Sequence, residues 1–201
     1  MDAKKLERLE SQLGFLAEID KAKQIIRNTV LMDQSRREND AEHSWHMAVA
    51  ALVLSEYTDF DELDITKVFQ MVVLHDIVEI DAGDVFAYAK VDPKLRAEQE
   101  RNAAERIFGL LPSDQKKQFI ALWIEFDERR SNESKYANAL DRFMPIYHNY
   151  MTEGLQWKRL NVTKEQVLTK NAHIQEGSKL LWEYIKMIVQ EAVENGYLID
   201  G

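Results

Sequence analysis

The sequence has no cysteine, and it has only three prolines and seven glycines in 201 residues. The absence of cysteine excludes disulfides, thiolate zinc sites and a thiol nucleophile. Few helix-breaking residues over a long chain favour helices over a turn-rich β fold. No run of 18 apolar residues occurs either, so the sequence predicts no membrane-spanning helix.

Positive charge is also scarce, because 35 acidic residues outnumber 26 basic ones and give a formal net charge of −9. No long basic stripe is present, which argues against binding of a nucleic-acid polymer. The N-terminal stretch MDAKKLERLE is charged and lacks an apolar signal core. We therefore expect a cytoplasmic protein that contacts no membrane and binds anions locally, through a metal ion or a few arginines.

The length fits one domain, and apolar residues recur with helical spacing along most of the chain. Asp40, Asp64 and the Asp92-Pro93 pair are typical of helix starts. No alternating strand pattern is evident, so we predict an all-α, single-domain helical bundle over residues 1–201. The predicted helices cover residues 3–31 (one helix or two), 40–57, 65–80, 93–107, 113–127, 133–151 and, as one or more helices, 163–194.

A His-Asp pair lies in the most apolar of these predicted helices. His75 and Asp76 are followed by Glu79, and positions 75 and 79 share one face of a regular helix. Charged groups in such a helix are costly unless they are paired or bound to a cation. The alternative is a hydrogen-bonded pair at a helix surface, but the flanking residues VVL and IV are apolar. The pattern therefore favours metal-competent groups within one helical turn.

Two more histidines open the preceding predicted helix, and an aspartate interrupts a later one. His43 and His46 share a face, so both imidazoles can bind a metal, or one binds and the other packs. Glu42 can orient one of these imidazoles. Asp141 lies among apolar residues, where a metal ion or an arginine on a neighbouring helix can each account for it.

The order His … His-Asp … Asp resembles the signature of the HD superfamily of metal-dependent phosphohydrolases. In this chain it reads as His43, His75-Asp76 and Asp141. The longer stretches SRRENDAEHSWHMA and LHDIVEIDAGDVFAY resemble the subgroup that contains the 5′-deoxynucleotidases. The resemblance covers roughly residues 15–155 and implies the helical HD-domain fold, with the helices of 163–195 packing on this region.

The resemblance also implies roles for individual residues. The family pattern carries an Arg-Trp pair where this chain has Arg27-Asn28, so the choice between a deoxyribose and a ribose ring stays open. By this resemblance His43, His75, Asp76 and Asp141 match the four metal ligands, Glu79 and Asp84 match the catalytic acidic residues, and Arg27 and Arg36 fall near the phosphate-contacting arginines.

Several of these roles have plainer alternatives. Glu79 can act as general acid or base, or can merely support His75. Asp84 can bind a sugar hydroxyl or orient the nucleophile, or can cap the turn after the preceding glycine. Arg27 and Arg36 can each donate two hydrogen bonds to phosphate oxygens, or they can form surface ion pairs with Glu38 or Glu42.

Two imidazoles and two carboxylates suit one divalent Mn, Co, Fe, Ni or Zn ion better than Ca. The resemblance implies that the bound metal activates water to hydrolyse a small-molecule nucleotide, a nucleoside 5′-monophosphate, to nucleoside and phosphate. The alternatives are another phosphate ester (a cyclic nucleotide, ppGpp or a dNTP) or a non-catalytic module that binds metal or nucleotide. The apolar stripe Leu181–Ala192 exceeds what one small bundle is expected to bury, and the resemblance likewise implies a homodimer.

Overall fold

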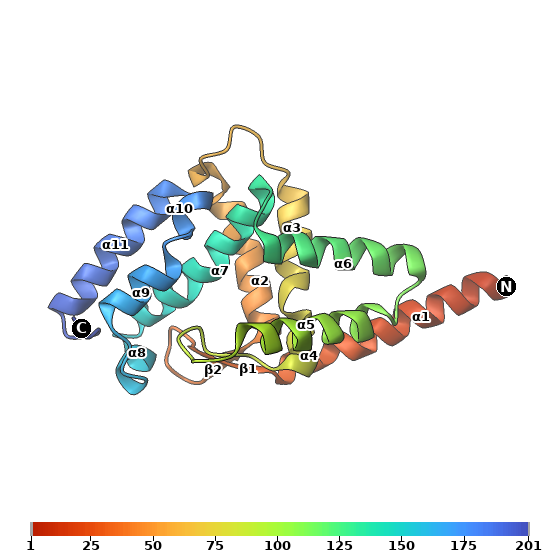
Figure 1. Ribbon diagram of the computed structural model, residues 1–201, viewed down its shortest axis with the longest axis horizontal. Helices are drawn as coiled ribbons and strands as arrows, with labels where there is room; N and C mark the ends of the chain where they lie inside the picture. Colours follow the sequence, from red (N-terminus) through yellow and green to blue (C-terminus); the bar gives the residue numbers. More distant parts are fainter. Residues whose placement is uncertain (1, 201) are drawn as a thin grey trace.

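Helices form almost all of the regular structure in residues 2–200, the part of the chain that the computed structural model describes (Figure 1). The first helix, α1 (Ala3–Ile19), projects beyond the other helices at its N-terminal end, and the 3₁₀ helix η1 (Asp20–Gln24) follows it. The predicted all-α fold is confirmed. Within the described range, no helix combines the length and apolarity needed to cross a membrane.

The prediction of helix over residues 3–31 is wrong at its C-terminal end, where the chain forms a strand. β1 (Ile26–Val30) pairs antiparallel with β2 (Arg37–Asn39), which lies between the predicted helices 3–31 and 40–57. The run IIRNTV is rich in β-branched residues, which prefer strands when a partner strand is available. That partner lies several residues further along the chain, so the helical spacing of the apolar residues gave the wrong structure.

A capping box starts α2 (Asp40–Val53). The Asn39 side chain accepts from the backbone N–H of Glu42 at 3.0 Å, and the Glu42 carboxylate accepts from the backbone N–H of Asn39 at 3.2 Å. The predicted N-cap, Asp40, is therefore one residue too late, and its side chain is buried instead. This cap fixes the first turn of α2, which carries His43. The short 3₁₀ helix η2 (Ser55–Tyr57) follows α2.

The predicted helix over 65–80 begins as expected and then changes its geometry. Asp64 caps α3 (Ile65–Leu74), but the 3₁₀ helix η3 (His75–Val78) and the short α4 (Glu79–Ala82) replace the rest. A 3₁₀ turn separates successive side chains by about 120° rather than 100°. The predicted common face of positions 75 and 79 is therefore lost. Gly83, with φ 74°, ends α4.

The next helices build the core around α7 (Asn132–Met151), which crosses the middle of the molecule (Figure 1). α5 (Pro93–Phe108) begins at the predicted Asp92-Pro93 signal and packs on α6 (Ser113–Glu128). α7 contacts α2, α3, α6 and the C-terminal helices. Its buried face carries Tyr136 and Leu140 as core residues and also the buried Asp141.

Four C-terminal helices complete the bundle: α8 (Leu155–Arg159), α9 (Lys164–Asn171), α10 (Ile174–Gly177) and α11 (Lys179–Glu194). Gly177 lets α10 approach α7 closely, because a Cβ there would lie 2.6 Å from the carbonyl oxygen of Lys135. Within α11, Leu181, Ile185 and Ile188 are buried inside the chain. The apolar stripe of this helix is therefore covered by its own bundle, which removes the reason for a dimer that the sequence suggested.

Candidate metal centre

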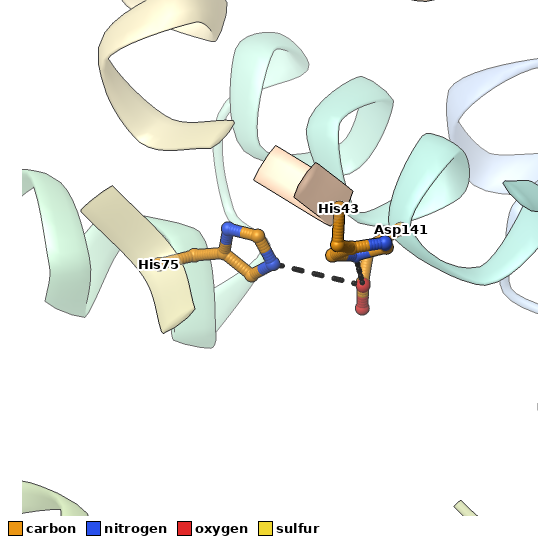
Figure 2. A group of neighbouring side chains, drawn as sticks. All are labelled: His43, His75 and Asp141. Carbon is orange, nitrogen blue, oxygen red and sulfur yellow. Dashed lines mark hydrogen bonds and ion pairs between the residues drawn. The ribbon is translucent and has the colours of Figure 1, made fainter. Parts of the chain in front are cut away.

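Three helical segments bring His43, His75 and Asp141 together in the interior (Figure 2). His43 comes from the first turn of α2, His75 from the start of η3 and Asp141 from the middle of α7. One ligand atom from each lies within 4.8 Å of the others, and all three residues are buried. Oδ1 of Asp141 is 3.1 Å from Nε2 of His43 and 3.7 Å from Nε2 of His75. Residues 98 apart in the sequence thus converge on one point.

Asp76 adds a second carboxylate to this group. Its Oδ1 lies 3.0 Å from Nε2 of His75, and its Oδ2 lies 3.9 Å from Nε2 of His43. The four residues predicted as ligands therefore present two imidazole nitrogens and two carboxylates to the same small volume. This N2O2 set has the donor chemistry of a site for a divalent transition metal.

The hydrogen bonding of His75 fits such an ion. Its Nδ1 lies 2.9 Å from the carbonyl oxygen of Val72, so Nδ1 carries the proton and donates it. Its Nε2 is buried and has no hydrogen-bond partner within residues 2–200, although Oδ1 of Asp76 is close by. Two acceptors so near each other in the interior need a cation or a proton between them. The hydrogen bond at Nδ1 therefore leaves Nε2 as the nitrogen that can bind a metal ion.

The other ring nitrogen of His43 faces a carboxylate that the sequence did not identify. Oε1 of Glu38, in β2, lies 3.5 Å from Nδ1 of His43, and Glu38 is almost fully buried. Glu42, the predicted orienting residue, instead caps α2 and pairs with Arg36 at the surface. His46 also turns away from the cluster and lies 3.4 Å from His148.

The electrostatics of the cluster favour positive charge. Burial lowers the pKa of His75, but the Asp76 and Asp141 carboxylates outweigh burial and raise its pKa to about 10. Burial likewise raises the pKa of Asp76, but His75 and Arg27 outweigh it and hold that pKa below its ordinary value. The pKa of Asp141 is also held well below its ordinary value, against burial, by Arg142 and the two histidines. A divalent cation competes with protons for such a site.

Arg27 lies next to the cluster and contacts a second group of acidic side chains. Its Nη1 is 2.6 Å from Oδ2 of Asp76, 3.3 Å from Oδ1 of Asp40 and 3.9 Å from Oε2 of Glu79. Burial raises the pKa of Glu79 to about 11 and that of Asp40 to about 7, and the negative charge of Asp76 adds to both shifts. Burial opposes the charge of Arg27, but the surrounding carboxylates outweigh it and raise its pKa, so the guanidinium stays ionised.

A pocket opens beside the cluster, and some of the remaining predicted site residues line it while others do not. Arg27, Asp84 and Asp141 all line this pocket. Arg36 does not, and its guanidinium forms two hydrogen bonds of 2.6 and 2.8 Å with Glu42 at the surface. Glu79 is outside the pocket lining too, but its contact with Arg27 connects it to the pocket.

A helical fold that brings two histidines and two aspartates together in its interior is the arrangement expected of an HD-domain protein. The profile of the HD domain family matches residues 19–182, so the chain belongs to the HD domain family. This finding confirms the predicted membership in the superfamily of metal-dependent phosphohydrolases.

Known relatives agree with this assignment. The human protein named 5′-deoxynucleotidase HDDC2 is 28% identical over 149 residues, which cover 74% of this chain and 71% of the human one. Its mouse counterpart is 28% identical over 147 residues, covering 73% and 72%. A crystal structure described as a predicted metal-dependent phosphohydrolase from Magnetospirillum magnetotacticum is 49% identical, covers 96% of both chains and has a TM-score of 0.92.

Proposed function

We propose that this protein is a metal-dependent phosphohydrolase that converts nucleoside 5′-monophosphates to nucleoside and phosphate. One observation carries the proposal: ligand atoms of His43, His75 and Asp141 lie within 4.8 Å of one another beside a pocket that Arg27 and Asp84 also line. The relatives named as 5′-deoxynucleotidases support the choice of substrate class.

In this proposal His43, His75, Asp76 and Asp141 hold one divalent ion, which is Mn, Co, Fe, Ni or Zn. When bound, such an ion neutralises phosphate charge and makes water a better nucleophile near neutral pH. The position of the buried Nε2 of His75, 3.0 Å from Oδ1 of Asp76 and 3.7 Å from Oδ1 of Asp141, supports this assignment, because one cation can bind the nitrogen and both carboxylates together.

Arg27 is the proposed phosphate contact, in preference to Arg36. Its guanidinium is buried, ionised and placed at the pocket wall, and a planar fork matches two phosphate oxygens. The Arg36 guanidinium is half exposed and already satisfied by Glu42. Substrate binding at Arg27 therefore needs only a change of partner among buried acceptors.

Glu79 and Asp84 are the proposed acidic residues of the reaction. As water adds to phosphorus, the bond from phosphorus to the 5′ oxygen breaks, and that oxygen needs a proton. Glu79 carries one at neutral pH, because burial raises its pKa to about 11. Asp84 lines the pocket and is placed to accept a hydrogen bond from a sugar hydroxyl or from the attacking water.

We further propose that the enzyme acts in the cytoplasm as a homodimer. The α11 stripe does not support this, but a separate apolar surface does. Val53 of α2 is 63% exposed, and Leu180 and Met187 of α11 are 57% and 56% exposed. These side chains border a groove between α2, α7 and α11, and a partner surface there would remove them from water.

The test combines elemental analysis with a substrate panel. Purified protein should contain about one divalent metal ion per chain and should release phosphate from 5′-dAMP and 5′-AMP in Mn or Co, but not from 3′-AMP. His75→Ala should lose both metal and activity, whereas His173→Ala, which alters a histidine outside the cluster, should keep the metal. Absence of phosphate release from every 5′-monophosphate would overturn the proposal and favour another ester or a binding module.

A further inference from the structure

The pocket beside the metal cluster extends well away from it along α7. Asp141 and Asn149 both line its wall, and eight positions on a helix correspond to about 12 Å along the axis. α8 closes the far end, where the backbone N–H of Trp157 donates to Oδ1 of Asn149 at 3.3 Å. The pocket therefore has a charged end at the cluster and a second end formed by α8.

Gln156 lies at this second end with an unused hydrogen-bonding group. The residue is 4% exposed and lines the pocket, and its Oε1 is buried without a hydrogen-bond partner in the described part of the chain. Buried amides are normally hydrogen-bonded, and a ligand atom can supply the missing partner.

We infer that the Gln156 amide is the residue that recognises the edge of the nucleobase. This inference rests on the proposed function, because it assumes that the phosphate end of the substrate lies at the cluster. The base is then the end farthest from Asp141, on the side of α8. A side-chain amide donates and accepts at once, so it pairs with any base edge that presents a donor beside an acceptor.

The two other side-chain amides near this end of the pocket, Asn149 and Asn171, are already hydrogen-bonded. Asn149 uses its Nδ2 to donate to the Pro145 carbonyl and its Oδ1 to accept from Trp157. Nδ2 of Asn171 donates to the Val167 carbonyl at 2.8 Å and to the Tyr88 hydroxyl at 3.2 Å. Among the described residues at this end of the pocket, Gln156 is therefore the one whose side-chain amide remains available to bind a ligand.

The wall opposite α7 has to move for a nucleoside to enter. The enclosed space is about 80 Å³, below the roughly 300 Å³ at which small-molecule sites begin. Residues 84–88 form this wall without helix or strand, and the Asn171–Tyr88 hydrogen bond ties the segment to α9. Outward movement of this segment breaks that bond and opens the pocket between Asp84 and Gln156.

The experiment compares substrates with and without a base. Gln156→Met keeps the side-chain length but removes the amide, and Gln190→Met, at an exposed position of α11, is the matched control. We expect kcat/KM for 5′-dAMP and 5′-dCMP to fall roughly 10- to 100-fold in Gln156→Met, while kcat/KM for 2-deoxyribose 5-phosphate and all values for the control stay unchanged. An equal loss on the abasic substrate, or no loss on the nucleotides, would overturn the inference.

A second variant tests the direction of the hydrogen bonds and does not depend on the first. Gln156→Glu keeps an acceptor and removes the donor, so N3 of cytosine and O4 of thymine, which only accept, lose their partner, while the N–H beside each of them keeps one. kcat/KM for both 5′-dCMP and 5′-dTMP should fall about tenfold, while kcat/KM for 2-deoxyribose 5-phosphate stays unchanged; no loss on either nucleotide would overturn the inference. If the wild type hydrolyses the abasic ester as well as the nucleotides, base recognition fails while phosphatase activity stands; if it hydrolyses none, the proposed function itself fails.

Discussion

Glu38 and His43 face each other in the interior, with Oε1 of Glu38 3.5 Å from Nδ1 of His43. The opposite nitrogen of the same ring points to Asp141 at 3.1 Å. A carboxylate on the far side of a metal-binding imidazole fixes its tautomer and orientation and makes it a stronger ligand. Glu38 is therefore placed to act on a bound metal through His43.

Glu38→Gln should weaken metal binding by about 10- to 100-fold, because a neutral amide supports the imidazole less well. Competition with a chelator of known affinity measures the change. Glu42→Gln is the control, since Glu42 is adjacent to His43 in sequence but pairs with Arg36 at the surface. The same loss of affinity in both variants would contradict the role of Glu38.

Arg27 should matter for stability as well as for substrate binding. Arg27→Met leaves the buried carboxylates of Asp76 and Asp40 without their nearest cation, which should lower the free energy of unfolding of metal-free protein by about 3–5 kcal/mol. Arg36→Met removes only an exposed ion pair and should cost no more than about 1 kcal/mol. Urea denaturation compares the two, and equal stabilities would argue against a buried counter-ion.

Local signals predicted the helices well and missed the hairpin for a physical reason. Asp64 and the Asp92-Pro93 pair cap helices as predicted, because a cap involves only neighbouring residues. β1 depends on pairing with β2, and a helical spacing of apolar residues in β1 does not reveal that partner. The break at His75 is equally hidden, since the sequence there continues the pattern of α3.

The sequence likewise identified only some of the site residues. The family signature pointed to the four ligand candidates, and the structure brings all of them together. It did not point to Glu38 or Asp40, whose contacts with His43 and Arg27 arise from the hairpin and from the capping of α2. Their presence in the run RREND was the available signal, but only the fold decides which carboxylate turns inward.

Glu79→Gln should reduce kcat by roughly 10²- to 10⁴-fold while metal content and fold are retained. The fold survives because burial raises the pKa of Glu79 to about 11, so a neutral amide replaces a neutral carboxylic acid. Asp81→Asn is the control, since Asp81 lies on the same short helix but pairs with Arg106 at the surface. Steady-state kinetics with metal analysis would contradict the proton-donor role if Glu79→Gln kept full kcat.

The stability of the protein should also depend on His173 in mildly acidic solution. Burial and the positive charges of Arg129 and Arg142 lower the pKa of His173 to about 4, against the opposing effect of Glu176 and Asp141. The unfolded chain has the ordinary pKa of about 6.5, so between these values it binds a proton that the folded chain does not. The stabilising contribution is therefore complete above pH ~6.5 and is lost as the pH falls toward ~4.

His173→Gln cannot take up this proton, so its free energy of unfolding should fall less steeply than that of the wild type over the same range. Urea denaturation of both proteins with a chelator present measures the difference, because the acid sensitivity of the metal cluster is then common to both. A free energy of unfolding of the wild type that falls steadily relative to that of His173→Gln as the pH falls supports the depressed pKa. Parallel curves would mean that His173 titrates alike in the folded and unfolded chains, and that neither its burial nor the two arginines act on it as the structure indicates.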